Sequence, residues 1–194
     1  MKSALHCLPA LLFLLAAGCS KDDPEAGLPA ATHTGANTAG CRINGQVFVA
    51  TGYGSGLGKV AAIGGGFADD SAYYLRLNGK FGDREGSLHL FLNSFPSKRN
   101  QGLVKTYALN HNTPVRPAAI PSQCMNYAAF FPNDSRQEVY ATDANHTGQI
   151  KITNVDVNTL NNRDVAGTFE FTAVSNLDPA KTIQVADGRF DRKQ

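Results

Sequence analysis

Alternating apolar and polar side chains constrain the fold of this chain more than any other feature. Leu88, Leu90 and Leu92 are each separated by a single residue. The same period of two recurs at residues 73–77, 149–153, 168–173 and 182–185. Side chains two positions apart share one face of a β-strand, so the pattern predicts antiparallel strands that each place one face on a core. No window of a dozen residues shows a convincing helical period.

Turn residues separate these segments. Asn44-Gly45 stands between Ile43 and Val47 and predicts a type I′ hairpin. Asn78-Gly79 has the composition of a turn at another strand end. About nine or ten strands fit between such signals, which predicts an all-β fold. An antiparallel β-sandwich and a partly closed meander barrel both agree with this pattern.

The N-terminus has the pattern of an export signal. A basic residue precedes an apolar run (8–17) that is shorter than the roughly 20 residues needed to span a bilayer. The run closes in Leu15-Ala-Ala-Gly-Cys19, which looks like the lipobox of bacterial lipoproteins. We therefore predict a signal peptide (1–18), cleavage after Gly18, and a lipid on Cys19 that anchors the protein to a membrane. The alternative is an ordinary secretory leader that contains a cysteine.

The segment after the anchor changes in composition. Residues 19–40 hold Asp, Pro, Ala, Gly and Thr with almost no large apolar side chain, so we expect a flexible tether. Residues 41–194 then form a single β-domain. The predicted address is the cell envelope, at the outer membrane.

Two cysteines remain in the mature chain after the leader and the lipidated residue are set aside. Cys41 and Cys124 in an oxidising compartment predict one disulfide, which would close a loop of about 80 residues and stabilise by about 4 kcal/mol on the chain-entropy model. The alternative is two buried free thiols. The histidines are scattered and no CxxC occurs, so no metal site is predicted.

Charge and motifs exclude several function classes. The formal net charge of +2 provides no basic face, so no nucleic-acid partner is expected. The glycine-rich segment 51–59 lacks the Walker spacing, because Tyr53 and Val60 stand where glycine and Ser or Thr are needed. No cofactor and no catalytic residue is predicted.

Aromatic side chains are the remaining candidates for a site. Tyr74 and Phe91 stand opposite the leucines of their own strands, and Tyr127 and Tyr140 belong to an aromatic-rich stretch. These four residues are either a second core layer or a platform on which sugars or other flat ligands stack.

Three motifs carry a resemblance. The opening Cys41-Arg-Ile-Asn-Gly45 and the closing Gly167-Thr-Phe-Glu-Phe-Thr-Ala173 and Asp187-Gly-Arg-Phe190 resemble a family of uncharacterised Bacteroidota lipoproteins with a small all-β domain. The resemblance implies the lipid-anchored address and the β-fold, and leaves the function open. In that lineage, Lys21 followed by acidic residues is similar to a signal for export to the outer leaflet, which implies exposure at the cell surface. A merely hydrophilic tether is the alternative.

Three functions are compatible with these observations. The first is a non-enzymatic binding or accessory module of the cell envelope, with a glycan, a small apolar ligand or an envelope protein as its partner. The second is a structural or assembly lipoprotein, and the third is a hydrolase with dispersed catalytic residues. A pocket lined by aromatic residues would favour the first, a broad exposed apolar patch the second, and clustered carboxylates or a His–nucleophile pair the third.

Overall fold

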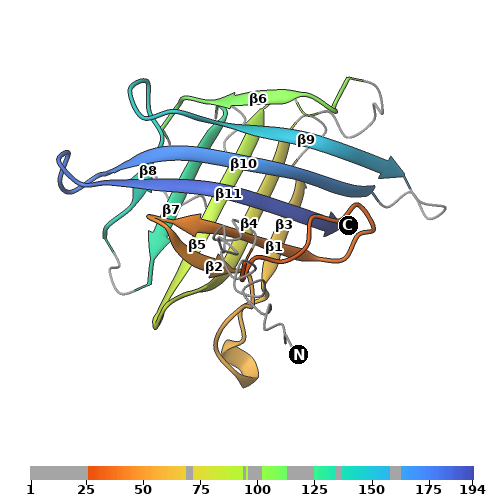
Figure 1. The fold of residues 1–194 in the computed structure, drawn as a ribbon, viewed down its shortest axis with the longest axis horizontal. Helices are drawn as coiled ribbons and strands as arrows, with labels where there is room; N and C mark the ends of the chain where they lie inside the picture. The colour runs from red at the N-terminus through yellow and green to blue at the C-terminus, as the bar shows by residue number, and fades with distance from the viewer. Residues whose placement is uncertain are drawn as a thin grey trace, which may run out of the picture.

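The computed structural model describes residues 26–68, 72–93, 95, 102–112, 125–133, 137–157 and 163–194. Nearly all regular structure in these residues is β-strand (Figure 1). The strands are β1 (Thr38–Ile43), β2 (Gln46–Val49), β3 (Ile63–Ala68), β4 (Ala72–Phe81), β5 (Arg84–Asn93), β6 (Thr106–Leu109), β7 (Tyr127–Pro132), β8 (Tyr140–Ala141), β9 (Gly148–Val157), β10 (Arg163–Ser175) and β11 (Thr182–Lys193). Within the described part of the chain, no helix is long and apolar enough to cross a membrane.

Eight of these strands form a closed antiparallel barrel. Their order around the barrel is β11-β1-β2-β4-β5-β7-β8-β10, and β10 pairs with β11 to close the ring. The all-β prediction is confirmed. Of the two predicted architectures the barrel is present, and it is fully closed because β11 pairs with β1, from Thr38↔Asp191 to Ile43↔Val185, as well as with β10. Within the ring, closure leaves no strand edge open to another chain, whereas β3 and β6 outside the ring are each paired along one side only among the described strands.

The two ends of the barrel differ. The connections β1–β2, β4–β5, β7–β8 and β10–β11 lie at one end, which we call the mouth. Toward the other end, which we call the far end, β3 continues β2 along the edge of β4, and β9 continues β8 along the edge of β10. β6 then pairs with β9. In Figure 1, β9, β10 and β11 cross in front of β3, β4 and β5, so the far end has the two layers of a sandwich.

The two predicted turns have different outcomes. Asn44 and Gly45 have φ values of 50° and 79°, as a type I′ hairpin requires, and they join β1 to β2. The turn predicted at Asn78-Gly79 is wrong, because both residues lie inside β4. A Cβ on Gly79 would stand 2.0 Å from the carbonyl oxygen of Val49, so this glycine allows β2 to approach β4.

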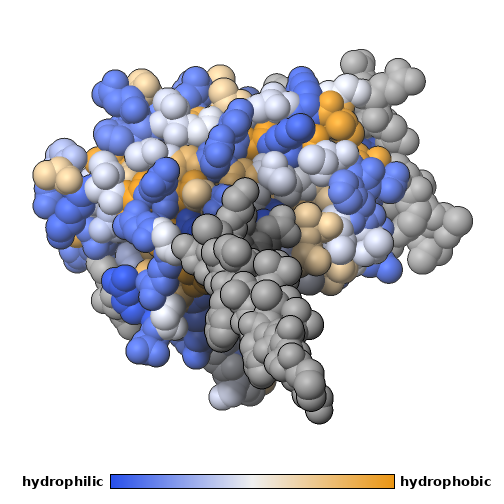
Figure 2. Space-filling model, viewed as in Figure 1, coloured by the Kyte–Doolittle hydropathy of each residue, from blue (hydrophilic) through white to orange (hydrophobic). Residues whose placement is uncertain are grey.

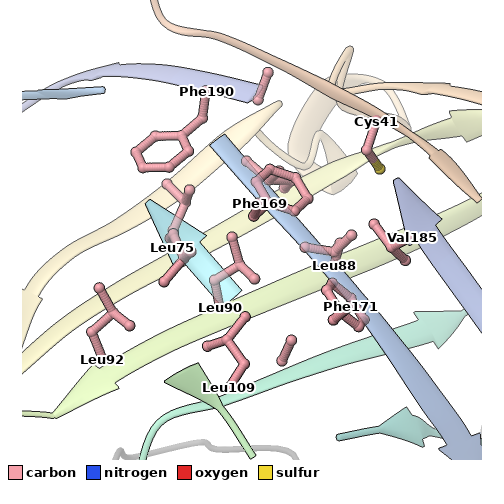
Figure 3. Packing of buried hydrophobic residues seen from close by; sticks show 14 of the residues in the cluster. Cys41, Leu75, Leu88, Leu90, Leu92, Leu109, Phe169, Phe171, Val185 and Phe190 are labelled. Atoms are coloured by element: carbon pink, nitrogen blue, oxygen red, sulfur yellow. The ribbon is translucent and has the colours of Figure 1, made fainter. Parts of the chain in front are cut away.

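The core fills the inside of the barrel. Leu88, Leu90 and Leu92 of β5 all point inward and are at most 1% exposed, as their alternation predicts. Figure 3 shows Leu75, Leu88, Leu90 and Leu92 packed with residues of the opposite wall, including Phe169 and Phe171. Burying each such side chain contributes roughly 1.5–3 kcal/mol, so this inner cluster is the main source of stability.

The predicted flexible tether is corrected from residue 26 onward. Residues 26–37, which we call the N-terminal latch, lie against the outside of the barrel, and β1 begins at Thr38. The carboxylate of Asp191 accepts hydrogen bonds from the Thr32 hydroxyl at 2.6 Å and from three backbone N–H groups. Composition did not predict this, because hydrogen bonds to a buried carboxylate here replace the apolar contacts that the segment lacks.

Candidate functional site

A cavity of about 190 Å³ lies in the mouth of the barrel. The turns and strand ends of the four hairpins surround it. Its lining consists of Ile43, Asn44, Gln46, Phe81, Arg84, Phe130, Pro132, Glu138, Tyr140 and Ile183. Mouths of β-barrels are common ligand sites, because the closed strands hold the lining rigid while the turns leave the opening free.

The floor of this cavity is aromatic and one rim carries a cation. The rings of Phe81 and Phe130 meet edge to face with centroids 5.3 Å apart. The Arg84 guanidinium lies 4.6 Å from the centroid of the Phe81 ring and forms no ion pair with any described residue. A guanidinium held over an aromatic ring keeps its N–H fork available for a carboxylate or another polar oxygen.

The rim also carries an acid, which is held in place by hydroxyl groups. The Glu138 carboxylate accepts a hydrogen bond from Tyr140 at 3.1 Å and one from Ser175 at 2.9 Å. Tyr140 is thus the one predicted aromatic candidate that lines the mouth. The mouth as a whole can hold a small ligand with an apolar body and a polar or acidic group.

A second hollow of about 340 Å³ lies on the outer surface of β9–β11, beside Ala31 of the N-terminal latch. Figure 2 shows this side of the molecule, where hydrophilic residues predominate and apolar patches are small. The Gln149 amide donates to Glu170 at 2.8 Å, and Arg189 donates to the carbonyl of Pro29, so these lining groups already bond within the chain. Although this hollow is larger, it is a polar surface groove without an accessible aromatic face, and we place the site in the mouth.

The other three aromatic candidates lie together on the outer face of β4, β5 and β7. Phe91 and Tyr127 stack with centroids 5.3 Å apart, and each is 1% exposed. The Tyr74 hydroxyl bonds to Nδ1 of His89 at 2.8 Å, and burial raises the pKa of Tyr74 to about 12. These residues belong to a second buried cluster. Of the two roles predicted for the aromatic candidates, a second core layer is therefore the one that fits these three.

The predicted disulfide gains no support from the strand order. Cys41 is a free thiol with no exposed surface, and burial raises its pKa. Cys124 lies outside the described residues, as do Gly18 and Cys19. Cys41 lies in β1 and Cys124 precedes β7 in the sequence; β1 and β7 are four positions apart in either direction around the barrel. A bridge needs α-carbons roughly 4.4–6.8 Å apart. Two strands on opposite sides of the barrel do not favour so short a distance, so the strand order argues against the disulfide, which stays a prediction.

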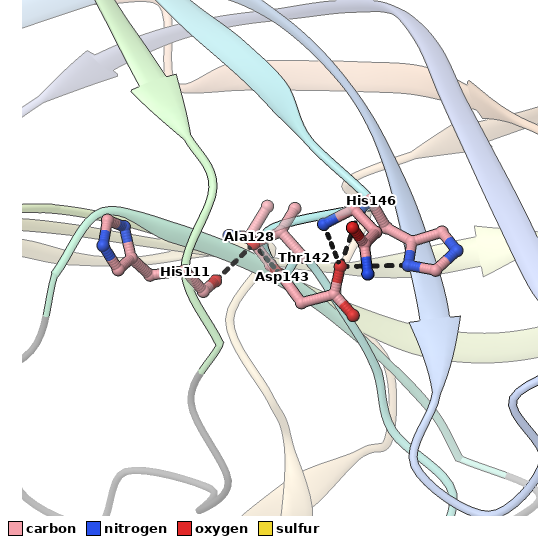
Figure 4. Close-up of polar contacts among 6 residues, drawn as sticks. His111, Ala128, Thr142, Asp143 and His146 are labelled. Atoms are coloured by element: carbon pink, nitrogen blue, oxygen red, sulfur yellow. Dashed lines mark hydrogen bonds and ion pairs between the residues drawn. The ribbon is translucent and has the colours of Figure 1, made fainter.

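One pair of polar residues, an aspartate and a histidine, is of the residue types found in the catalytic sites of hydrolases. Asp143 and His146 are 3.0 Å apart in the turn between β8 and β9 (Figure 4). Burial alone would raise the pKa of Asp143. The hydrogen bonds from the backbone N–H groups of His146 and Asn145 and from the His146 ring have the larger combined effect, so the pKa is lowered. The Thr142 hydroxyl donates to the His111 carbonyl at 2.7 Å and accepts from the Ala128 N–H, so these contacts hold the turn.

Of the residues that line the mouth, only Tyr140 was predicted from the sequence, and the anchor of the latch was missed as well. Phe81 and Arg84 flank the β4–β5 turn, where Gly82 has a φ of 57°. The sequence analysis predicted the turn at Asn78-Gly79 instead, so neither Phe81 nor Arg84 was expected beside a turn. The signal that would have found them is Gly82 followed by Asp83, also a common turn pair. Gln46 and Asp191 carried no sequence signal.

The fold and the mouth define a class: up-and-down β-barrel proteins with a small ligand-sized opening. The chain belongs to the family described as Domain of unknown function (DUF6252), whose model matches residues 86–192, from within β5 to within β11. No curated protein and no solved structure matches the chain. Among the described residues, no group of three or more His, Cys, Asp or Glu side chains could hold a metal ion.

Proposed function

We propose that this protein is a lipid-anchored cell-envelope protein whose barrel is a non-enzymatic module that binds a small ligand in its mouth. The observation that carries the proposal is the mouth cavity, with an aromatic floor and a guanidinium on its rim. Sites of this kind hold the apolar part of a ligand by burial and orient it through a few polar groups.

The size of the cavity limits the ligand. Drug-sized ligands occupy roughly 300–1,000 Å³, and the mouth offers about 190 Å³. A single sugar ring or a short organic acid matches this volume better than an oligosaccharide or a protein segment. Among the three partners predicted from sequence, a small ligand is therefore the one that we propose.

The N-terminal latch bears on how the anchor presents the barrel. The Arg42 side chain donates to the carbonyl of Ala26 at 3.0 Å, beside the β1–β2 hairpin that forms part of the mouth. If Cys19 carries lipid, the chain from there to Ala26 reaches about 25 Å at full extension. We propose that the lipid holds the mouth close to the outer membrane, with the protein exposed at the cell surface.

The mouth is tested by filling it. Gln46 lines the cavity, and Gln184 is an exposed residue on the outer face of β11, so Gln46→Trp and Gln184→Trp form a matched pair. Methyl glucoside and hexanoate, used as probes, are expected to shift the methyl NMR signals of Ile43 and Ile183 in the wild type and in Gln184→Trp. Gln46→Trp should abolish the shifts. Failure of both probes in the wild type, or unchanged shifts in Gln46→Trp, would contradict the mouth site.

The anchor is tested separately. Cys19→Ala should release the protein from the membrane fraction or leave it at the unprocessed mass, and protease added to intact cells should remove the wild-type barrel. A processed Cys19→Ala protein that still fractionates with membranes would exclude the lipid. Full protection from protease would place the barrel on the periplasmic face.

A further inference from the structure

The connection between β2 and β3 projects from the barrel, and we call its residues, 50–62, the finger. In Figure 1 the finger extends below the barrel, on the side opposite β6 and β9. A short 3₁₀-helix, η1 (Gly56–Gly58), forms its tip. Leu57 in this helix is 111% exposed relative to a reference peptide, whereas the other large apolar side chains on the described surface are at most 58% exposed. The finger therefore presents one leucine that is wholly open to solvent.

Backbone hydrogen bonds hold the finger in one shape. Tyr53 and Val60 exchange hydrogen bonds of 3.2 and 2.8 Å, which pair the two arms of the finger below its tip. Gly54 has a φ of 77°, and a Cβ there would stand 2.5 Å from the carbonyl oxygen of Gly58, so this glycine allows the arms to come close together. A leucine on a mobile loop can fold back onto the protein, but these contacts keep Leu57 at the tip.

Side-chain hydrogen bonds fix the base of the finger to the wall of the barrel. The Tyr53 hydroxyl bonds to the Ser87 hydroxyl of β5 at 3.1 Å, and Ser87 donates to the side-chain oxygen of Asn78 at 2.7 Å. The Asn78 amide in turn donates to the carbonyl of Ala61 at 2.7 Å. Asn78 is buried, and a buried polar network whose members pair with one another is rigid. The barrel thus sets the direction in which the finger points.

The start of the N-terminal latch contacts the strand that leads into the finger. The Arg42 side chain donates to the carbonyl of Ala26 at 3.0 Å, and a Cβ on Gly27 would stand 3.4 Å from the Val47 side chain of β2. β2 then continues directly into the finger. If Cys19 carries lipid, the membrane surface lies within about 25 Å of Ala26, which is the reach of the chain between them. The finger and the anchored end of the chain therefore start from the same part of the barrel.

We propose that the finger inserts Leu57 into the membrane that holds the lipid anchor. The one charged residue in the sequence of the finger, Lys59, is exposed and has the sign that anionic head groups attract. A single leucine cannot bind a membrane by itself, but the lipid already holds the barrel there, so the second contact only has to fix its orientation. This inference rests on the lipid anchor of the proposed function, and it adds which surface of the barrel faces the bilayer.

The first test is the depth of the tip in a bilayer. The chain contains no tryptophan, so Leu57→Trp introduces a single fluorescent probe. Val104→Trp is the matched control, because Val104 is 55% exposed and precedes β6 by two residues. The lipidated variants are placed in vesicles of equal parts phosphatidylcholine and phosphatidylglycerol with brominated acyl chains. The fluorescence of the Leu57→Trp protein should shift to the blue and fall about twofold relative to unbrominated vesicles, and that of the Val104→Trp protein should not change.

The second test uses the native leucine, since a tryptophan can itself favour the membrane interface. Backbone hydrogen exchange in residues 54–59, corrected for intrinsic rates, is compared among vesicle-bound proteins. Exchange should be several-fold slower in the wild type and in Val104→Gln than in Leu57→Gln. Leu57 is exposed throughout, so neither substitution at this residue removes a contact that the fold needs.

The outcomes separate the finger from the anchor. A lipid on Cys19, detected by mass, together with a tip that is neither quenched nor protected, would overturn this inference and leave the anchor intact. Absence of the lipid would overturn both. A blue shift without quenching that grows with protein concentration would indicate contact between two copies of the chain, and it would overturn the membrane as the partner of Leu57.

Discussion

The mouth and the far end of this barrel are built from the same strands but are closed in different ways. At the mouth, each strand hydrogen-bonds to both neighbours, and a small cavity with an aromatic floor remains. At the far end, β3 and β9 lead the sheet into two layers, and Phe67, Tyr73, Phe95 and Tyr107 fill the space between them. A ring of strands can leave its opening empty, whereas two layers must be packed to stay together.

The largest expected effect concerns packing. Phe95 has no exposed surface and contacts Tyr73, Phe67 and Tyr107 with centroids 5.1, 5.7 and 5.7 Å away. Phe95→Ala should lower the free energy of unfolding by up to about 5 kcal/mol. Phe81→Ala at the mouth should cost nearer 3 kcal/mol, because water can enter a cavity that is already open.

Urea unfolding of both variants measures this difference. Equal losses, or a greater loss for Phe81→Ala, would mean that the mouth contributes to stability as a packed core does. That result would remove the distinction between the two ends.

The next effect concerns the N-terminal latch, which Asp191 fixes near the far end. Asp191→Asn removes the charge that three backbone N–H groups and the Thr32 hydroxyl bond to. The loss should be about 1–3 kcal/mol, with faster proteolysis within residues 26–37. Asp187→Asn is the control, since its 3.6 Å contact with Arg42 is exposed and worth little.

The same carboxylate gives the latch a pH dependence. Burial alone would raise the pKa of Asp191. The hydrogen bonds from Thr32, Ala36, Thr34 and Gly35 have the larger combined effect, so the pKa is lowered. A lowered pKa stabilises the folded state above the unfolded value of about 3.9, and this contribution is lost as the pH falls through the folded value. Wild-type proteolysis in the latch should therefore rise only well below pH 4, and a latch already open at pH 5 would contradict this.

Much of this fold was predictable because it depends on local periodicity. The alternation of Leu88, Leu90 and Leu92 predicted an inward face, and Asn44-Gly45 predicted the β1–β2 hairpin. Closure was not predictable, because it depends on pairings such as Thr38↔Asp191 between the two ends of the chain. The latch was missed for a similar reason: hydrogen bonds to one carboxylate leave no periodic pattern in the sequence.

The candidate site was less predictable than the fold. Side-chain type alone grouped Tyr140 with Phe91 and Tyr127, but the pleat places Tyr140 at the mouth and the other two in a buried outer cluster. Arg84 and Phe81 come together only because β4 and β5 form a hairpin at Gly82. A site assembled from four separate turns cannot be read from any one segment.

A smaller effect on stability is expected at the rim of the mouth. Arg84→Gln removes an exposed guanidinium that forms no ion pair with a described residue, so the free energy of unfolding should change by less than about 0.5 kcal/mol. Hexanoate binding should fall about tenfold in the same variant, because a charge-assisted hydrogen bond is lost. Hexanol binding should stay unchanged, and an equal fall for hexanol would show that Arg84 acts through the shape of the mouth.

The smallest expected effect is that of a reductant, and it tests the closure of the ring itself. Cys41 lies in β1, and Cys124 precedes β7 by three residues in the sequence; β1 and β7 are on opposite sides of the barrel, four positions apart in the ring. A disulfide between the two cysteines would stabilise by about 4 kcal/mol on the chain-entropy model, and reduction would then lower the melting temperature by many degrees. The strand order instead predicts no change on reduction and two free thiols in the unfolded, unreduced mature protein. Absence of free thiols, or a large drop in melting temperature on reduction, would contradict this expectation and support the bridge.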